Sequence, residues 1–247
     1  MCHTEKGKLV LVNYEVCDTF ATITMDDGKA NVISDQMQTE IHAALDRAAA
    51  ERPVVVLTGR PGMFSGGFDL QVLRSGGTTA TDMVVGGFEL ARRLLSFPTP
   101  VIVAATGHAV AMGLFVLLSG DYRIGAAGPF KLTANEVAIG LTMPYAATAI
   151  LRQRLTPAAF NRAVTIAEVF SPDDAVCADI LDEVVVADRL TTAIHDAATR
   201  LAALDPKAHI SSKLRARAHA LDEIRRGIEI DFAQFDAGSQ MKGRRDQ

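Results

Sequence analysis

Two short and almost wholly apolar runs constrain this chain most strongly, because each is followed at once by a glycine-rich turn and a helical pattern. The runs are Val54–Thr58 and Pro100–Ala105. Parallel strands that are covered by helices on both faces typically have continuous apolar sequences of this kind. The repeated order of strand, turn and helix therefore predicts an α/β layer fold with right-handed crossovers.

The remaining patterns complete an outline of the chain. Period-two alternation and β-branched runs predict further strands at Leu9–Val16, Thr19–Met25, Asp121–Ile124 and Val184–Val186. Helices are predicted to begin at Ser34 or Asp35, either of which can serve as the N-cap, and at Thr156 and Ser171. Others are predicted over 70–73, 82–96, 114–118 and 144–154, with a loop at 75–79.

From Leu190 onward no strand pattern occurs, and helices are predicted over 190–204 and from Pro206 to the end. The composition changes near residue 188. We therefore expect two regions: a layered core over residues 1–188 and a C-terminal helical region over residues 189–247.

Composition excludes several classes of protein. The net charge of −4 provides no global basic field for nucleic acid, and no apolar run reaches the ~20 residues of a membrane span. The three cysteines are scattered, so neither a disulfide framework nor a zinc site is indicated, and Cys177 is predicted to be a buried thiol. The polar N-terminus has no signal-peptide core. A cytoplasmic protein without nucleic-acid or membrane partners is expected.

The chemistry is predicted to lie in the stretch from Thr99 to Met143. A strand that turns through glycine into a helix leaves backbone N–H groups free at the helix start, and such groups can stabilise a developing negative charge. The segment Ala134–Gly140 places Glu136 among apolar neighbours. A carboxylate in that environment is suited to moving a proton.

The loop Phe64-Ser-Gly-Gly-Phe-Asp-Leu70 and the stretch Thr106–Gly140, with Asp121-Tyr-Arg and Asn135-Glu-Val-Ala-Ile-Gly-Leu141, resemble the crotonase superfamily of enoyl-CoA hydratases and isomerases. The resemblance runs from about Tyr14 to Ile230. It implies a crotonase-like spiral of ββα units with C-terminal helices that pack between the subunits of a homotrimer or a hexamer. The implied substrate is an acyl-CoA thioester. No metal or redox cofactor is implied, because coenzyme A arrives as part of the substrate.

The resemblance also implies roles for individual residues. The N–H groups of Phe68 and Met112 would hydrogen-bond the thioester oxygen, and Glu136 would be the catalytic carboxylate. Met112 is a departure from the glycine that is usual in the family, so its side chain must find room beside the ligand. The residues expected to bind the substrate are Lys29, Gly67, Phe68, Asp69, Leu70, Met112, Gly113 and Phe115.

Phe115 is the larger departure. Hydratases usually carry one of two water-activating glutamates at this position, whereas mitochondrial-type Δ3,Δ2-enoyl-CoA isomerases have an apolar residue there and keep the other glutamate. The residues therefore favour an isomerase that shifts a Δ3 double bond to Δ2 through a dienolate, with Glu136 moving the proton. The alternatives are a hydratase with an atypical active site, another enolate chemistry that uses Glu136, and a non-catalytic acyl-CoA-binding protein.

Several polar residues have structural interpretations as well. Asp69 is predicted to stabilise a turn by accepting backbone N–H groups, and Asp121 to cap or orient structure. His108 is either a proton donor or, as we favour, a hydrogen-bonded side chain near the core. Lys29 and Arg60 either contact coenzyme A phosphates or are solvated, and the charges over 213–226 are predicted to form the wet face of a helix.

Overall fold

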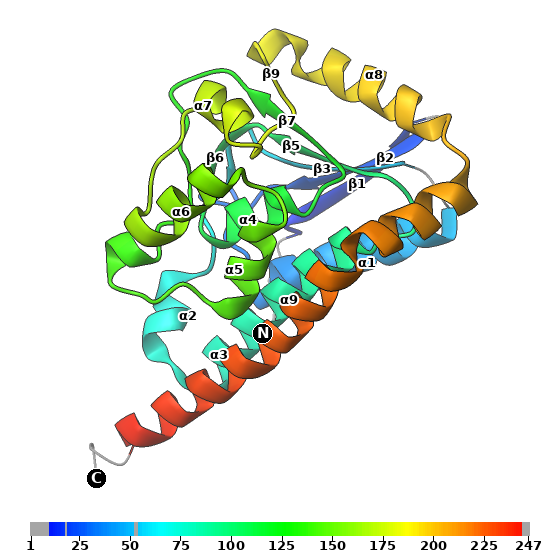
Figure 1. The fold of residues 1–247 in the computed structure, drawn as a ribbon. Helices are drawn as coiled ribbons and strands as arrows, with labels where there is room; N and C mark the ends of the chain where they lie inside the picture. Colours follow the sequence, from blue (N-terminus) through cyan, green and yellow to red (C-terminus); the bar gives the residue numbers. More distant parts are fainter. Residues whose placement is uncertain (1–9, 18, 52–53, 244–247) are drawn as a thin grey trace, which may run out of the picture.

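The computed structural model describes residues 10–17, 19–51 and 54–243, and its largest sheet has six strands. Their order is β1 (Val12–Cys17), β2 (Phe20–Met25), β3 (Val54–Gly59), β5 (Val101–Ala105), β7 (Tyr122–Ala126) and β9 (Glu183–Val185). β1 is antiparallel to β2, and every other neighbouring pair is parallel (Figure 1). The predicted strands are therefore confirmed, apart from Leu9, which lies outside the described residues.

A second, smaller sheet contains three parallel strands, β4 (Gly62–Ser65), β6 (Gly107–Val110) and β8 (Leu132–Thr133). Sequence patterns do not predict these strands, because they are short and two of them lie within stretches whose glycines indicate turns. Each follows a strand of the large sheet: β4 follows β3, β6 follows β5 and β8 follows β7. The chain therefore winds as a spiral of ββα units, as expected.

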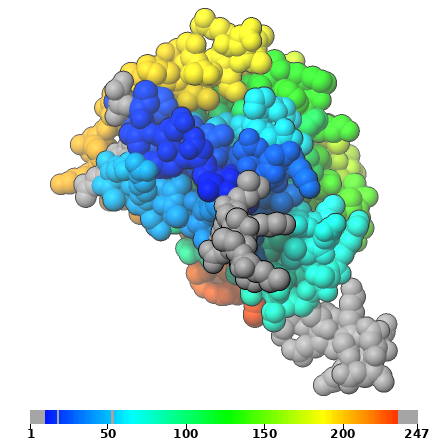
Figure 2. Space-filling view, turned by 180° about the vertical axis from the view of Figure 1, so that it is seen from behind, coloured from blue at the N-terminus to red at the C-terminus, as the bar shows by residue number. Residues whose placement is uncertain are grey.

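The large sheet is covered on both faces. Val55 and Leu57 of β3 belong to the main core, whereas Val54 and Val56 belong to a second cluster on the other face. The helices α1 (Asp35–Glu51), α3 (Gly77–Leu95), α4 (Met112–Leu118) and α5 (Tyr145–Arg152) contribute to the main core, and α8 (Leu190–Ala202) covers the second cluster. The N-terminal part of the chain, coloured blue, forms much of the surface seen from behind (Figure 2). Residues 54–57 of β3 are all buried and alternate between the two clusters, which confirms the prediction of a strand covered on both sides.

The helices begin close to the predicted residues, with one error. The remaining elements are α2 (Leu70–Ser75), α6 (Pro157–Ile166), α7 (Pro172–Cys177), α9 (Pro206–Gly243) and two short 3-10 helices, η1 (Val137–Ile139) and η2 (Ala187–Arg189). The loop predicted over 75–79 is wrong, because α3 begins at Gly77 rather than at Asp82. Gly76 and Gly77, with φ of 67° and 74°, turn the chain from α2 directly into α3.

The alternatives that the sequence left open at helix starts are decided by side-chain contacts. The Met37 N–H donates to Ser34 Oγ at 3.3 Å, so Ser34 is the N-cap of α1. Thr156 and Ser171 cap α6 and α7 as predicted. Cys177, predicted to be buried, is exposed, because it ends the short helix α7 whose buried residues are Pro172 and Ala175.

The long helix α9 runs diagonally across the molecule beside α3 and is anchored through Asp121 (Figure 1). The Asp121 carboxylate accepts hydrogen bonds from the Val101 N–H and from Lys213 Nζ, both at 2.7 Å, and pairs with Arg217 at 2.8 Å. Lys213 is only 7% exposed, so the predicted wet face is wrong for this residue and for Arg217. The two cations lie four residues apart on one helix face, which points at Asp121 rather than at solvent.

Cys2 and the polar start of the chain lie outside the described residues. Within the part of the chain that the structure describes, no helix is both long enough and apolar enough to cross a bilayer.

Candidate active site

A cleft of about 1080 Å³ opens beside the two glycine-rich loops, the first over Phe64–Leu70 and the second over Thr106–Gly113. Its size lies slightly above the usual range for small-molecule sites, roughly 300–1,000 Å³. Its walls come from parts of the chain far apart in sequence: the first loop, α2, α3, α4, the segment 135–144, α5 and α9. Of the predicted site residues, the structure brings Phe68, Leu70, Phe115 and Glu136 together in this cleft.

The two loops touch at Gly67. A Cβ added there would lie 2.9 Å from the Val110 carbonyl oxygen and 3.3 Å from the Met112 nitrogen, and the φ of 92° also favours glycine. The Gly67 carbonyl accepts the Ile33 N–H at 2.8 Å, which ties the first loop to the segment before α1. Gly113 packs equally closely, since a Cβ there would lie 2.4 Å from the Ser65 carbonyl oxygen. The sequence needs glycine at both positions so that the loops can meet.

Both predicted oxyanion donors are available in these loops. Met112 is the first residue of α4, whose first hydrogen bond runs from the Phe115 N–H to the Ala111 carbonyl at 3.2 Å. The Met112 N–H therefore has no partner within the helix. Neither it nor the Phe68 N–H donates a hydrogen bond to another described residue. Two free backbone donors on touching loops are suited to holding a carbonyl oxygen as it gains charge.

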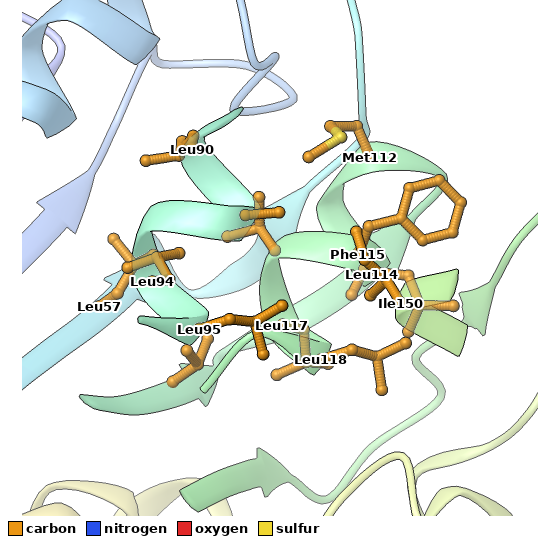
Figure 3. Packing of buried hydrophobic residues seen from close by; sticks show 14 of the residues in the cluster. Leu57, Leu90, Leu94, Leu95, Met112, Leu114, Phe115, Leu117, Leu118 and Ile150 are labelled. Atoms are coloured by element: carbon orange, nitrogen blue, oxygen red, sulfur yellow. The ribbon is translucent and has the colours of Figure 1, made fainter. Parts of the chain in front are cut away.

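The Met112 side chain does not compete for the cleft. It is fully buried and points towards α3 (Figure 3). A Cβ added at Gly87 of α3 would lie 3.4 Å from its sulfur and 2.5 Å from the Phe68 ring, so the absent side chain at Gly87 makes room for both groups. The departure from glycine at Met112 is therefore accommodated by the core.

Three aromatic rings form an apolar wall of the cleft. The Phe115 ring stacks on Phe88, with centroids 6.0 Å apart and planes at 24°, and Phe68 meets Phe88 edge-on at 6.2 Å. All three rings line the cleft. This wall has no group that can orient water or accept a proton.

Glu136 is a buried carboxylate of the cleft. Its side chain is 7% exposed, and its Oε2 atom is buried without a hydrogen-bond partner among the described residues. Burial raises the pKa of this carboxyl to about 7. Next to it, the buried Oδ1 of Asn135, a residue without a role predicted from the sequence, also has no partner within the described chain. With its raised pKa, the Glu136 carboxyl can accept and return a proton near neutral pH.

The C-terminal helix contributes residues that the sequence did not single out. Gly227, Ile230 and Asp231 of α9 line the cleft. The Asp231 carboxylate accepts the N–H groups of Tyr145 and Ala146, each at 3.0 Å. No local pattern could have placed these residues in the site, because they follow Glu136 by about ninety positions.

The other predicted polar residues lie outside the cleft. The Asp69 carboxylate accepts the Gln71 N–H at 2.8 Å and the Val72 N–H at 3.3 Å, which confirms its predicted role in stabilising a turn. His108 Nδ1 accepts the Lys131 N–H at 2.9 Å, as the hydrogen-bonded alternative predicts. Lys29 is exposed, and its carbonyl accepts Arg60 Nε at 2.9 Å.

The comparisons with known proteins agree on one family. Residues 15–245 match the family model of enoyl-CoA hydratase/isomerase. A probable enoyl-CoA hydratase, EchA14 of Mycobacterium tuberculosis, is 32% identical over 205 residues, which cover 81% of this chain and 78% of that protein.

Solved structures show the same fold at higher identity. A family protein from Pseudomonas syringae is 46% identical, with a TM-score of 0.90 and coverage of 91% of this chain and 98% of that one. The apo enoyl-CoA isomerase of Mycobacterium tuberculosis is 45% identical, with a TM-score of 0.86 and coverage of 89% and 96%. The relatives thus carry both the hydratase and the isomerase name.

Proposed function

This chain belongs to the enoyl-CoA hydratase/isomerase family, and we propose that within it the protein is an isomerase that moves a double bond of an acyl-CoA thioester from the 3- to the 2-position. The observation that carries the proposal is that Glu136 and Phe115 line the same cleft. A buried carboxyl with a pKa of about 7, whose Oε2 atom has no partner among the described residues, lines the same cleft as an apolar ring at the position where hydratases usually have a second glutamate.

The proposed reaction needs one base and one oxyanion site. Glu136 removes a proton from C2, and the electron pair of the broken C2–H bond passes to the thioester oxygen, giving a dienolate. The N–H groups of Phe68 and Met112 hold this oxygen, and the loss of one such donor typically costs about 3–4 kcal/mol of transition-state stabilisation. As the electrons return, a C2=C3 bond forms, the C3=C4 bond is lost, and Glu136 gives its proton to C4.

The other acidic groups of the cleft are already engaged. Both oxygens of Asp231 accept backbone N–H groups, and Glu223 pairs with Arg152 at 3.7 Å. This supports Glu136 as the one proton carrier among the described carboxylates of the cleft. The stacked rings of Phe88 and Phe115 favour a dry site, in which hydration of the product is suppressed.

The deciding experiment incubates the purified protein separately with trans-3-enoyl-CoA and trans-2-enoyl-CoA of several chain lengths, and identifies products by chromatography and mass spectrometry. Conversion of the 3-enoyl to the 2-enoyl form without hydration is expected. Hydration of the 2-enoyl form would favour the hydratase alternative, to which the name of the 32% identical relative points. Binding of acyl-CoA with no turnover of either would favour a non-catalytic binding protein.

A variant tests the role of the base. Glu136→Gln keeps the size of the side chain but cannot accept the proton, so kcat should fall by at least about 100-fold. Affinity for a saturated acyl-CoA, measured by calorimetry, should stay close to that of the wild type. Full activity in this variant would exclude Glu136 as the base.

The proposal includes the oligomeric state of the protein. We expect a homotrimer or a hexamer, with the C-terminal region over 189–247 between subunits, and light scattering coupled to gel filtration would measure its mass. A cytoplasmic location remains a prediction from the sequence.

A further inference from the structure

The segment that carries Glu136 is held internally by local hydrogen bonds alone. It joins β8 to α5, its η1 turn lies beside α6, and the four backbone hydrogen bonds within it, at 2.9–3.2 Å, link residues only three to five positions apart. Its apolar side chains Val137, Ile139 and Leu141 are 41%, 51% and 50% exposed, so they contribute little burial. Segments with few buried contacts open easily. The place of the Glu136 carboxylate therefore depends on how the two ends of the segment are held.

One end is held by a tertiary helix cap. α5 begins at Tyr145, and its N-cap residue is Pro144, which has no side-chain acceptor. The first N–H groups of a helix need partners from elsewhere. Here Asp231 of α9 supplies them: Oδ1 accepts the Tyr145 N–H and Oδ2 accepts the Ala146 N–H, both at 3.0 Å. The negative charge is also favourable at the positive end of the α5 dipole.

A glycine one turn earlier lets α9 approach this closely. A Cβ added at Gly227 would lie 2.5 Å from the Ala146 nitrogen and 2.8 Å from its Cα, so any side chain would push the two helices apart. Ile224 and Ile228, on either side of this glycine, lie in the main core and keep α9 in place. We call Gly227 and Asp231 the α9 clamp.

The α9 clamp borders the reaction site. Gly227 and Asp231 line the same cleft as Glu136. Both oxygens of the buried Asp231 carboxylate are used by N–H groups, so the residue is suited to holding α5 rather than to carrying a proton. The other charged groups that line the cleft are Arg152, Glu223 and Arg226.

We propose that Asp231 is a positioning residue: by capping α5 from α9, it fixes the end of the segment that holds Glu136 and thereby sets the carboxylate against the substrate. This inference rests on the proposed role of Glu136 as the base. It also makes the C-terminal helix of the chain a part of its own active site.

The test compares Asp231→Ala and Asp231→Asn with Glu229→Ala. Glu229 is an exposed carboxylate of α9 that pairs with Arg225 outside the cleft, so it is a matched control. The first readout is amide hydrogen exchange of a peptide that covers residues 134–148. The second is kcat against pH with 3-enoyl-CoA.

In Asp231→Ala, exchange of this peptide should rise and kcat should fall about 10- to 100-fold, because small misplacements of a catalytic group have effects of this size. Water that reaches Glu136 should also move the acidic limb of the kcat profile to lower pH. Asp231→Asn should recover part of kcat, since its single amide oxygen can still accept one of the two N–H groups. Glu229→Ala should match the wild type in both readouts.

Unchanged exchange in Asp231→Ala would overturn the inference, and so would faster exchange with an unchanged kcat and pH profile. If the wild type hydrates 2-enoyl-CoA in place of isomerising 3-enoyl-CoA, the isomerase proposal fails, and the same two readouts during hydration still decide the role of Asp231. A wild type that turns over neither substrate overturns both proposals.

Discussion

At the scale of single residues, the burial that suits Glu136 to catalysis opposes folding. Its pKa rises from 4.5 to about 7, so between these pH values the folded state keeps a proton that the unfolded state has released. A carboxyl whose pKa is raised on folding makes the protein less stable as pH rises through that window. The full stability is present below the unfolded pKa, and the loss is complete above the folded one.

This gives a prediction for stability. Between pH 5 and pH 8, the wild type should lose roughly 2–3 kcal/mol of unfolding free energy relative to Glu136→Gln, in which the titrating group is absent. Urea unfolding of both proteins at the two pH values, followed by circular dichroism, measures the difference. An equal pH dependence in the two proteins would mean that water reaches the Glu136 carboxyl freely.

At Met112, the contribution of side-chain packing can be measured separately from that of the backbone N–H. Met112 is proposed to act through its backbone N–H, while its side chain is buried against α3. Met112→Ala keeps the donor but leaves a cavity, so it should lower the unfolding free energy by about 2–5 kcal/mol. The value of kcat at a temperature where the variant stays folded should change only a few-fold. A large loss of kcat without a loss of stability would show that the side chain itself contributes to the site.

At the scale of elements, buried ionic contacts decide where α9 docks. Lys213 and Arg217 reach Asp121, which lies just before β7, and burial lowers the pKa of Lys213 to about 8 although Asp121 opposes the shift. The attraction among these buried charges does little more than offset the free energy needed to remove them from water. The loss of one partner, however, leaves the other charges buried and unpaired.

Asp121→Ala should therefore destabilise the protein by about 3–5 kcal/mol, since it leaves two buried cations without their carboxylate. Asp222→Ala is the control, because this residue pairs with Arg225 and Arg226 on the exposed side of α9, where ion pairs contribute about 0–1 kcal/mol. Urea unfolding of the two variants gives both values. Similar small losses would mean that α9 is held by its apolar contacts alone.

At the scale of the whole molecule, the C-terminal region is tied to both sides of the large sheet. α8 covers the second cluster, while α9 places Ile224 and Ile228 in the main core and lines the cleft. Both helices follow β9, the last strand of the described chain. A division at residue 188 therefore separates parts that share buried surface.

Removal of residues 205–247 should expose the apolar surface of α3 and α5 that α9 covers, and open the cleft. We expect this shortened chain to lose cooperative thermal unfolding by circular dichroism and to lose acyl-CoA binding by calorimetry. Cooperative unfolding at the wild-type temperature, with binding retained, would contradict the view that α9 completes the core and the site.

The sequence by itself determined the parallel strands, the helix starts at Thr156 and Ser171, the glycine loops and the carboxylate at Glu136. These follow from signals within a few residues: continuous apolar runs, capping side chains, and glycines where backbones must meet. Only the tertiary structure decided the rest. The small sheet, the burial of Lys213 and the cap on α5 by Asp231 depend on contacts between segments far apart in the chain. Such contacts leave no local pattern, because each partner satisfies its hydrogen bonds or its charge only when the fold brings the other to it.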